Sequence, residues 1–409
     1  MANLVPSNGI KFKVDVVARH NTEDDCWVVI DGKVYDVTDY LESHPGGKRI
    51  LMSVAGKDAT AQFANFHNVP NILANYAKKL YIGDLDQEHK EPPKYQGDLF
   101  GNLLPYSEPN WYHSWKSPYY NDSHKKLREF MRNWVDTELM PYIEEWDKAE
   151  QIPKSMIKRF GEVGILAAFL DYGKWRGNEF GIPPPGGITE SEWDAFHGLI
   201  LRDELGRIAS AGVKWAMVTG PALALPTILN FGTKEMQQRI IGPVVRGDKV
   251  ICLAMTEPYS GSDVAAFQTV GVKQPDGGWL VSGEKKFITT GVWADYFVIA
   301  VKTDPKAGAS GMSLLLGERG FPGLKTRGFK VQGWAGSGTA YVTMENMKIP
   351  PQNLIGKEGN GFRQLMHNLN LERLQGQAGG VRSCRVLLEE AMKHALTRKT
   401  FGQFLIERK

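Results

Sequence analysis

The sequence predicts an α+β protein of several domains, on three observations. The 409 residues exceed the length at which a single hydrophobic core is usual. Short β-branched runs separated by Gly, Pro and Asp occur near the amino terminus and again from about residue 251 to 356. Apolar residues at helical spacing fill the stretches between and after these runs.

Composition excludes several classes of protein. Hydrophobic residues make up 42% and charged residues 23%, which are ordinary globular values. The net charge of +3 is too slight to indicate a nucleic-acid or membrane-surface partner. No apolar run reaches the roughly 18 residues of a membrane span, so none is expected.

Cysteine usage and the amino terminus bear on the compartment. Cys26, Cys252 and Cys384 lie far apart without CxxC spacing, which favours a reducing compartment over a disulfide framework. Residues 1–9 show neither a signal core nor an Arg-rich transit pattern. We therefore expect a cytoplasmic protein, with peroxisomal and mitochondrial locations left open.

Residues 1–88 predict a small α+β domain. Two short strands, Trp27 to Ile30 and Lys33 to Val37, are joined by Asp31-Gly32, a strong hairpin signal. His44 then stands before Pro45-Gly46-Gly47, which presents its imidazole from a loop rather than from a helix face. A loop histidine alone is most often merely solvated.

The whole string from Trp27 through His-Pro-Gly-Gly to Phe66-His67 and Tyr81 to Leu85 resembles cytochrome b5. The resemblance implies haem b, with His44 and His67 as the two axial ligands of the iron. Two imidazoles leave no open coordination position, so such a haem passes single electrons. The alternative is a haem-free module of the same fold that binds steroids or protein partners.

Residues 89–109 read as a polar linker with several prolines, and residues 110–250 as an all-α domain. Helices are expected from Asp122, from Ser155 to Ala168 and from Glu192 to Ala209, with their charged residues on solvated faces. The aromatic loop from Tyr172 to Asn178 is expected to reshape a substrate cavity or to contact the haem module.

Residues 251–356 predict a β domain that carries two loop motifs. Met255 to Ala265 follows the apolar strand Val250 to Ala254, and Gly283 to Gly291 comes after a Pro/Asp/Gly turn. The first motif offers backbone N–H groups and serine hydroxyls to an anionic or heteroaromatic ligand. Gly333 to Thr339 and Ile349 to Gly356 add further Gly-containing turns.

These motifs, in this order, resemble the acyl-CoA dehydrogenase family over residues 110 to 409. The resemblance implies an all-α domain, a β-barrel-like middle domain and a partial carboxyl-terminal helical bundle. It also implies FAD, with the isoalloxazine edge at Met255 and Thr256 and the pyrophosphate or the acyl-CoA at Gly261 and Ser262. The remaining flavin contacts fall on the second motif, with Phe287 against the ring and two residues at the reactive nitrogen: Ile288 and Thr289.

Residues 357–409 place a carboxylate on the apolar stripe of a helix. Glu372 falls between Leu369 and Gly376, where an unpaired charge is costly unless it serves a function. The family resemblance implies that Glu372 is the catalytic base and that Arg373 orients the helix. The alternative is that Arg373 or another partner simply neutralises Glu372.

Arg398, Thr400 and Phe401 resemble the segment through which one subunit of the family contacts its neighbour's flavin, which implies a homo-oligomer. The family continues beyond the position of Lys409, so a truncated helical domain is expected. The predicted function is α,β-desaturation of an acyl-CoA, with electrons passed to the fused haem or to a separate carrier. The alternative is a haem-binding electron carrier or interaction protein whose dehydrogenase part is inactive.

Overall fold

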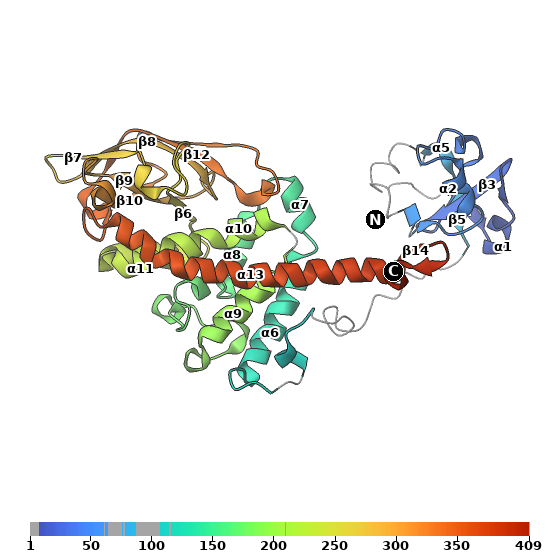
Figure 1. Cartoon of the computed structure of the whole chain (residues 1–409), viewed down its shortest axis with the longest axis horizontal. Helices are drawn as coiled ribbons and strands as arrows, with labels where there is room; N and C mark the ends of the chain where they lie inside the picture. The colour runs from blue at the N-terminus through green and yellow to red at the C-terminus, as the bar shows by residue number, and fades with distance from the viewer. Residues whose placement is uncertain are drawn as a thin grey trace. The chain divides into compact units, whose positions relative to one another are not determined.

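The computed structural model describes residues 8–60, 62–63, 76, 78–86, 107–113, 116–208 and 210–408. The chain divides into two compact units, Met1–Leu99 and Phe100–Lys409. The division falls inside the predicted linker 89–109, and the finer domain limits stay predictions. Figure 1 labels the elements of both units.

The first unit contains a five-stranded sheet in the order β1-β5-β4-β3-β2. β1 and β5 are parallel, and the other pairs are antiparallel. The strands and the two longest described helices are β1 (Lys11–Phe12), α1 (Val14–Val17), β2 (Asn21–Thr22), β3 (Asp25–Ile30), β4 (Lys33–Asp36), α2 (Lys48–Ser53) and β5 (Tyr81–Leu85). A short α5 (Lys78–Leu80) precedes β5.

The predicted hairpin of this unit is present. β3 and β4 pair with Val29 opposite Val34, and Asp31 and Gly32 have φ of 50° and 71°. These left-handed residues give the turn a twist that matches the flanking strands. Successive residues point to opposite faces, so Val28 joins one hydrophobic cluster and Val29 the other.

The second unit begins with helices that share one large core. These helices are α6 (Asp122–Trp134), α7 (Ile143–Lys148), α8 (Lys154–Glu162), α9 (Ala195–Leu205), α10 (Ala211–Thr219), α11 (Leu225–Phe231) and α12 (Lys234–Val245). Two expected helices are shorter than predicted. α8 ends at Glu162, because Gly164 turns the chain at a φ of 84° where a Cβ would meet the Pro183 carbonyl oxygen at 2.7 Å.

The second shortened helix is α9, which starts three residues later than expected. Asp194 caps it by accepting hydrogen bonds from the N–H groups of Phe196 and His197. The backbone N–H of Asp194 donates to His197 Nδ1 at 3.2 Å, and in α6 that of Asn121 donates to His124 Nδ1 at 3.0 Å. The two imidazoles stack with centroids 3.8 Å apart, so both helix starts are joined.

An eight-stranded, mainly antiparallel sheet follows the helices, with β6 beside β9 in a parallel pair. Its strands are β6 (Ile251–Ala254), β7 (Val270–Lys273), β8 (Trp279–Ile288), β9 (Tyr296–Lys302), β10 (Met312–Glu318), β11 (Leu324–Gly328), β12 (Ala340–Ile349) and β13 (Leu354–Ile355). One face packs on the helical core through Val298, Ala300 and Leu314, and the other forms a second cluster around Trp279 and Phe297.

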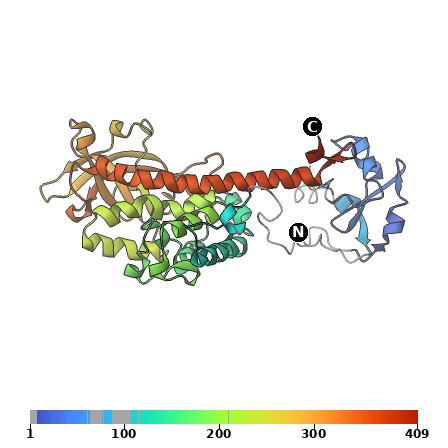
Figure 2. The same cartoon turned by 60° about the horizontal axis from the view of Figure 1, so that its bottom comes forward.

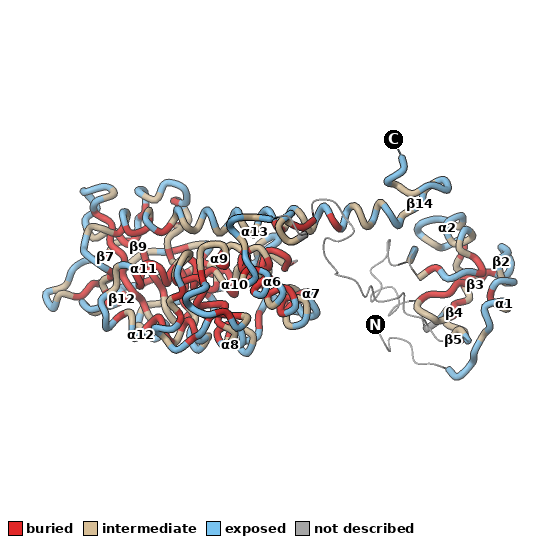
Figure 3. Tube along the Cα trace, turned by 90° about the horizontal axis from the view of Figure 1, so that it is seen from below, coloured by how far each residue is buried: buried red, intermediate tan, exposed pale blue. Residues whose placement is uncertain are grey.

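The long helix α13 (Gly361–Thr397) runs from the sheet along the helical part of this unit (Figures 1 and 2). It packs on α9 and α11 and leads to a two-stranded hairpin, β14 (Lys399–Thr400) and β15 (Gln403–Phe404). Figure 3 shows the buried residues concentrated where the other helices and the sheet meet. α13 is exposed at several apolar positions: Leu374, Val381, Leu387, Leu388 and Leu396.

Among the residues that the structure describes, no helix is long and apolar enough to cross a membrane.

Candidate active site

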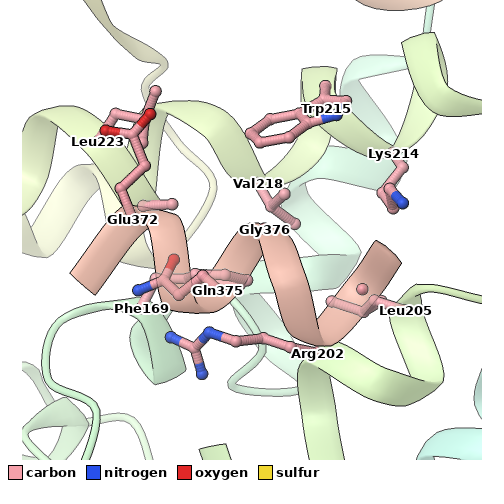
Figure 4. Close-up of a pocket in the computed structure, with 12 residues that line it drawn as sticks. Phe169, Arg202, Leu205, Lys214, Trp215, Val218, Leu223, Glu372, Gln375 and Gly376 are labelled. Atoms are coloured by element: carbon pink, nitrogen blue, oxygen red, sulfur yellow. The ribbon is translucent and has the colours of Figure 1, made fainter. Parts of the chain in front are cut away.

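A cavity of about 60 Å³ lies between α13 and the preceding helices of the second unit. Residues three or four apart on one face of α13 form one wall: Glu372, Gln375, Gly376 and Gly379. The opposite wall combines apolar and cationic side chains: Phe169, Arg202, Leu205, Lys214, Trp215, Val218, Ala222 and Leu223. Figure 4 shows the Glu372 side chain extending from α13 toward Leu223. Gly379 lies on this face, whereas the neighbouring Gly380 is exposed and does not line the cavity.

Glu372 is the only carboxylic acid among the residues that line this cavity. Its Oε2 is buried and has no hydrogen-bond partner among the described residues. Burial raises the pKa of Glu372, and the charge of Arg373 partly opposes that rise. A carboxyl group with a raised pKa can take up a proton near neutral pH, as a general base must.

Arg373 lies on the exposed side of α13 and does not line the cavity. Its Nη1 donates to Oδ1 of Asn370 at 3.2 Å, on the same helix. Its influence on Glu372 is therefore electrostatic, and its predicted role in orienting the helix stays a prediction.

A π-helical turn, Gly220–Ala224, shapes the wall opposite Glu372. Such wide turns inside helices are often associated with functional sites. This one brings Ala222 and Leu223 to the cavity, and Asn368 of α13 donates from Nδ2 to the Leu223 carbonyl at 2.9 Å. The hydrogen bond holds the turn against α13 one helical turn before Glu372.

The first predicted flavin motif forms a loop after β6. Met255 and Thr256 are half-buried, while Gly261 and Ser262 are exposed. A Cβ on Gly261 would lie 3.9 Å from Cγ2 of Thr256, so the loop brings these two predicted flavin-binding positions close together. The Thr256 carbonyl accepts from the backbone N–H of Lys286 at 2.8 Å, which joins the loop to β8.

The second motif lies at the end of β8, beside the first. Phe287 and Thr290 have φ of 62° and 60°, a region that non-glycine residues rarely adopt and that often marks ligand sites. Phe287 is 54% exposed, Ile288 is buried, and Thr289 is half-buried between Ile288 and Thr290. The Oγ1 of Thr290 is buried without a partner among the described residues. These groups suit a planar polar cofactor such as a flavin. The exposed Phe287 ring offers a stacking surface, and the Thr290 hydroxyl and the hydroxyls of the first loop offer hydrogen bonds.

The predicted subunit-contact residues Arg398, Thr400 and Phe401 lie beyond the end of α13 and do not line the cavity. Arg398 follows Glu372 by 398 − 372 = 26 residues, about 39 Å at the rise of an α-helix. Phe401 is 95% exposed. The structure therefore does not bring these residues to the Glu372 site of the same chain, and their contact with a neighbouring subunit stays a prediction.

The first unit places His44 in the loop before α2, as the sequence predicts. His44 Nδ1 lies 3.3 Å from the carbonyl oxygen of Gly47. A hydrogen bond to that oxygen assigns the proton to Nδ1, so Nε2 is the nitrogen with the lone pair that iron requires. Gly46 packs so closely that a Cβ would lie 2.8 Å from His44 Cε1. His44 thus fits an axial haem ligand, whereas His67 lies outside the described residues.

The prediction that the charged residues of the expected helix Glu192 to Ala209 lie on a solvated face is wrong for three of them. Arg202, Glu204 and Arg207 are 4%, 0% and 1% exposed. Oxygens of Glu204 lie 3.0 Å from an Arg132 nitrogen and 3.2 Å from an Arg207 nitrogen, so Glu204 belongs to a buried ion-pair network. The sequence already indicated that these charges are buried, because the apolar residues Ile200, Leu201 and Leu205 leave α9 without a uniformly polar face.

Comparison with known protein families matches both units of the chain. Residues 13–86 match the cytochrome b5-like haem/steroid-binding domain. Residues 121–248, 252–347 and 359–409 match the N-terminal, middle and C-terminal domains of acyl-CoA dehydrogenases. These matches assign the helical part, the β sheet and the long helix α13 that carries Glu372 to an FAD-dependent oxidoreductase.

Individual relatives support the same family. An acyl-CoA dehydrogenase of Alternaria alternata is 38% identical over 75% of this chain and 71% of the relative. One of Emericella nidulans is 36% identical over 74% of this chain and 70% of the relative. The crystal structure of an acyl-CoA dehydrogenase from Geobacillus kaustophilus superposes with a TM-score of 0.64 at 30% identity, covering 72% of this chain and 73% of that one. The chain belongs to the acyl-CoA dehydrogenase family and carries a cytochrome b5-like domain on its amino-terminal side.

Proposed function

We propose that this protein catalyses the FAD-dependent α,β-dehydrogenation of an acyl-CoA thioester, and that its cytochrome b5-like domain binds haem for electron transfer. The observation that carries the proposal is the Glu372 carboxyl, which lines the cavity with one oxygen buried and without a partner. The functional parts are residues 1–88 for haem, 89–109 as linker, and 110–250, 251–356 and 357–409 for the dehydrogenase.

Glu372 takes the proton from the carbon α to the thioester. Burial raises its pKa, which increases its affinity for that proton. The apolar side chains of Val218 and Leu223, which line the cavity with Glu372, exclude water and so strengthen electrostatic interactions there.

Two groups of residues hold the cofactors in this proposal. Met255, Thr256, Gly261 and Ser262 hold the flavin together with the second motif: Phe287, Ile288 and Thr289. His44 and His67 supply the axial ligands of haem b. When bound, the flavin would accept the β-hydrogen as hydride, and the haem would exchange single electrons.

The partners of this proposal are an acyl-CoA, a second copy of the chain and an electron acceptor. Exposed leucines of α13, such as Leu387 at 70%, support association with other copies in a homo-oligomer. The acceptor is the protein's own haem or a separate carrier.

Anaerobic mixing of the FAD- and haem-loaded protein with acyl-CoAs tests the proposal. We expect the flavin absorbance to bleach with a suitable acyl-CoA, and the haem spectrum to become that of reduced iron. Bleaching without haem reduction would assign the electrons to a separate carrier. Failure of every acyl-CoA to bleach the flavin would leave a haem protein with an inactive dehydrogenase part.

The variant Glu372→Gln identifies the base in the same experiment. Its bleaching rate is expected to fall about 10²-fold or more, because the amide cannot take up the proton. Lys234→Gln serves as the control, since this exposed lysine of α12 does not line the cavity.

A further inference from the structure

Arg319 holds the loop at the end of the second flavin motif. The loop covers residues 289–295, between β8 and β9, and Arg319 directly follows β10. Its Nε donates to the carbonyl of Ala294 at 2.6 Å, and its Nη2 donates to the carbonyl of Gly291 at 2.7 Å. A planar guanidinium presents these two donors in a fixed orientation. Arg319 therefore fixes the positions of two carbonyls of the loop relative to each other.

Both carbonyls depend on Arg319 for a donor. Gly291 is buried and Ala294 is 0% exposed. Among the described residues, no other group donates a hydrogen bond to either carbonyl. A buried carbonyl without a donor is unfavourable. The other contacts of the guanidinium orient it, because Nη1 donates to Thr326 Oγ1 at 2.8 Å and the Phe297 ring lies 5.2 Å from its carbon.

The loop contains a residue with unfavourable backbone geometry, Thr290, which has a φ of 60°. Its hydroxyl has no partner among the described residues, so the side chain does not stabilise this conformation. Such geometry persists where several surrounding contacts impose it. The N–H groups of Thr290 and Val292 donate to the carbonyls of Ser337 and Gly338 at 2.9 and 3.2 Å. These bonds hold the loop through its N–H groups, and Arg319 holds it through its carbonyls.

The loop is continuous with the residues that are proposed to face the flavin. Ile288 and Thr289 lie between Phe287 and Thr290, which both have a positive φ. The N–H of Gly291 donates to the carbonyl of Ile288 at 3.1 Å, so a displacement of Gly291 also displaces this segment. Binding groups need to be held to about 0.5 Å for a site to be productive. A change in the contacts of the guanidinium is therefore expected to reach the flavin-binding residues.

We propose that Arg319 is a positioning residue for the flavin. Through Gly291 and Ala294 it holds residues 287–289 in the conformation that binds the isoalloxazine ring, without touching the ring itself. This inference rests on the proposed function, since it concerns the flavin motif of the same site. An arginine suits this role because its guanidinium supplies two N–H donors in one plane, which the single ammonium of lysine does not.

Equilibrium dialysis of the full chain against FAD tests the inference. Arg319→Gln is expected to raise the Kd for FAD about tenfold or more. The visible circular dichroism of bound FAD, taken as FAD-loaded minus FAD-free protein, should also change because the residues around the ring move. Arg327→Gln is the matched control, since Arg327 is exposed on β11 and its guanidinium packs on the Tyr341 ring. Wild-type affinity and dichroism in Arg319→Gln, or an equal loss in Arg327→Gln, would overturn the proposal.

Two milder variants separate positioning from general stability. Arg319→Lys keeps the charge without the paired donors, so its Kd for FAD should lie between those of the wild type and Arg319→Gln. Thr326→Val removes the acceptor that orients Nη1 and should raise the Kd about threefold. Urea unfolding of the FAD-free chain measures stability in each variant. A lower urea midpoint with wild-type FAD affinity and dichroism would make Arg319 a purely structural residue and overturn the proposal. Wild-type affinity in both milder variants would overturn it even where Arg319→Gln does not fold.

The inference and the proposed function fail in distinguishable ways. Equal FAD binding and equal bleaching by an acyl-CoA in the wild type and Arg319→Gln would keep the dehydrogenase and remove the role of Arg319. Absence of FAD binding by the wild-type chain would remove the proposed function and this inference with it.

Discussion

Lys285 and Glu257 form a buried ion pair, with Nζ of Lys285 donating to Oε1 of Glu257 at 2.7 Å. Nζ also donates to the Met255 carbonyl at 3.1 Å. The Glu257 carboxylate accepts from the backbone N–H groups of Gln268 and Thr269, at 2.6 and 3.1 Å. Burial lowers the pKa of Lys285 to about 8, with Glu257 opposing that shift. The pair therefore fixes the loop of the first flavin motif to β8.

Lys285→Met should weaken both folding and flavin binding. The substitution leaves Glu257 buried without its cation, which typically costs about 3–5 kcal/mol. Urea unfolding and FAD titration measure the two effects. Lys273→Met is the control, because Lys273 pairs with Glu358 at an exposed site where such pairs contribute about 0–1 kcal/mol. Equal losses in the two variants would contradict a special role for the buried pair.

The sequence predicts the strands better than the buried charges. The strands predicted at Trp27 to Ile30 and Lys33 to Val37 agree to within two residues with β3 and β4, because β-branched and aromatic residues flank a clear Asp-Gly turn signal. Lys285 stands in Glu284-Lys285-Lys286, which resembles an exposed stretch. Only the two-residue period of β8, with Val281 buried four residues earlier, places Lys285 inward.

In the candidate site, too, one residue could be predicted from local sequence and another could not. Glu372 could be predicted because a carboxylate on an apolar stripe stands out in one helix. Arg202 could not be predicted as a cavity residue, since Asp203 and Glu204 follow it directly in the sequence and suggest a neutralised, solvated group. In the folded chain they pair with arginines from elsewhere, including Arg382, which is 382 − 203 = 179 residues after Asp203. Such long-range pairing is not visible in local sequence.

Arg373→Gln should move the acid limb of the pH–rate profile to higher pH. Glu372 acts as a base only when ionised, and the charge of Arg373 lowers its pKa. Removing that charge raises the pKa of Glu372, so activity is lost at a higher pH as the solution is acidified. The shift should shrink with added salt because Arg373 is exposed.

Arg363→Gln is the control for this shift. Arg363 is exposed on the same helix, 372 − 363 = 9 residues and about 13 Å from Glu372, beyond the screening length at physiological salt. Steady-state rates across pH measure both variants. An unchanged acid limb in Arg373→Gln would show that Glu372 does not set that limb.

His197 should make folding sensitive to acid. Burial lowers its pKa below the ordinary 6.5, although a hydrogen bond with Asp194 opposes the shift. The unfolded chain then binds a proton more readily than the folded one, so stability is present above pH 6.5 and falls as pH decreases below it. Protonation also removes the Nδ1 acceptor that caps α9.

His197→Gln separates this effect from general acid denaturation. Glutamine can accept the same backbone hydrogen bond at this capping position but does not titrate. Urea unfolding between pH 5 and 7, a range that brackets the histidine pKa of about 6.5, should show a flatter pH dependence for the variant. An identical slope in both proteins would assign the acid sensitivity to other groups.

Gly46→Ala should weaken haem binding while leaving the dehydrogenase unit intact. A Cβ at this position would lie 2.8 Å from His44 Cε1 and 3.2 Å from His44 Nδ1, so the imidazole must move. A displaced ring loses the orientation set by the Gly47 carbonyl, and such supporting contacts typically account for about 10–100-fold in metal affinity. Titration with haem, followed by the Soret band, measures the loss. Ser43→Ala is the control, because Ser43 is exposed and its hydroxyl donates to the Tyr40 carbonyl rather than to His44, so it should keep wild-type affinity. Wild-type affinity in Gly46→Ala would mean that His44 does not hold the iron in this orientation.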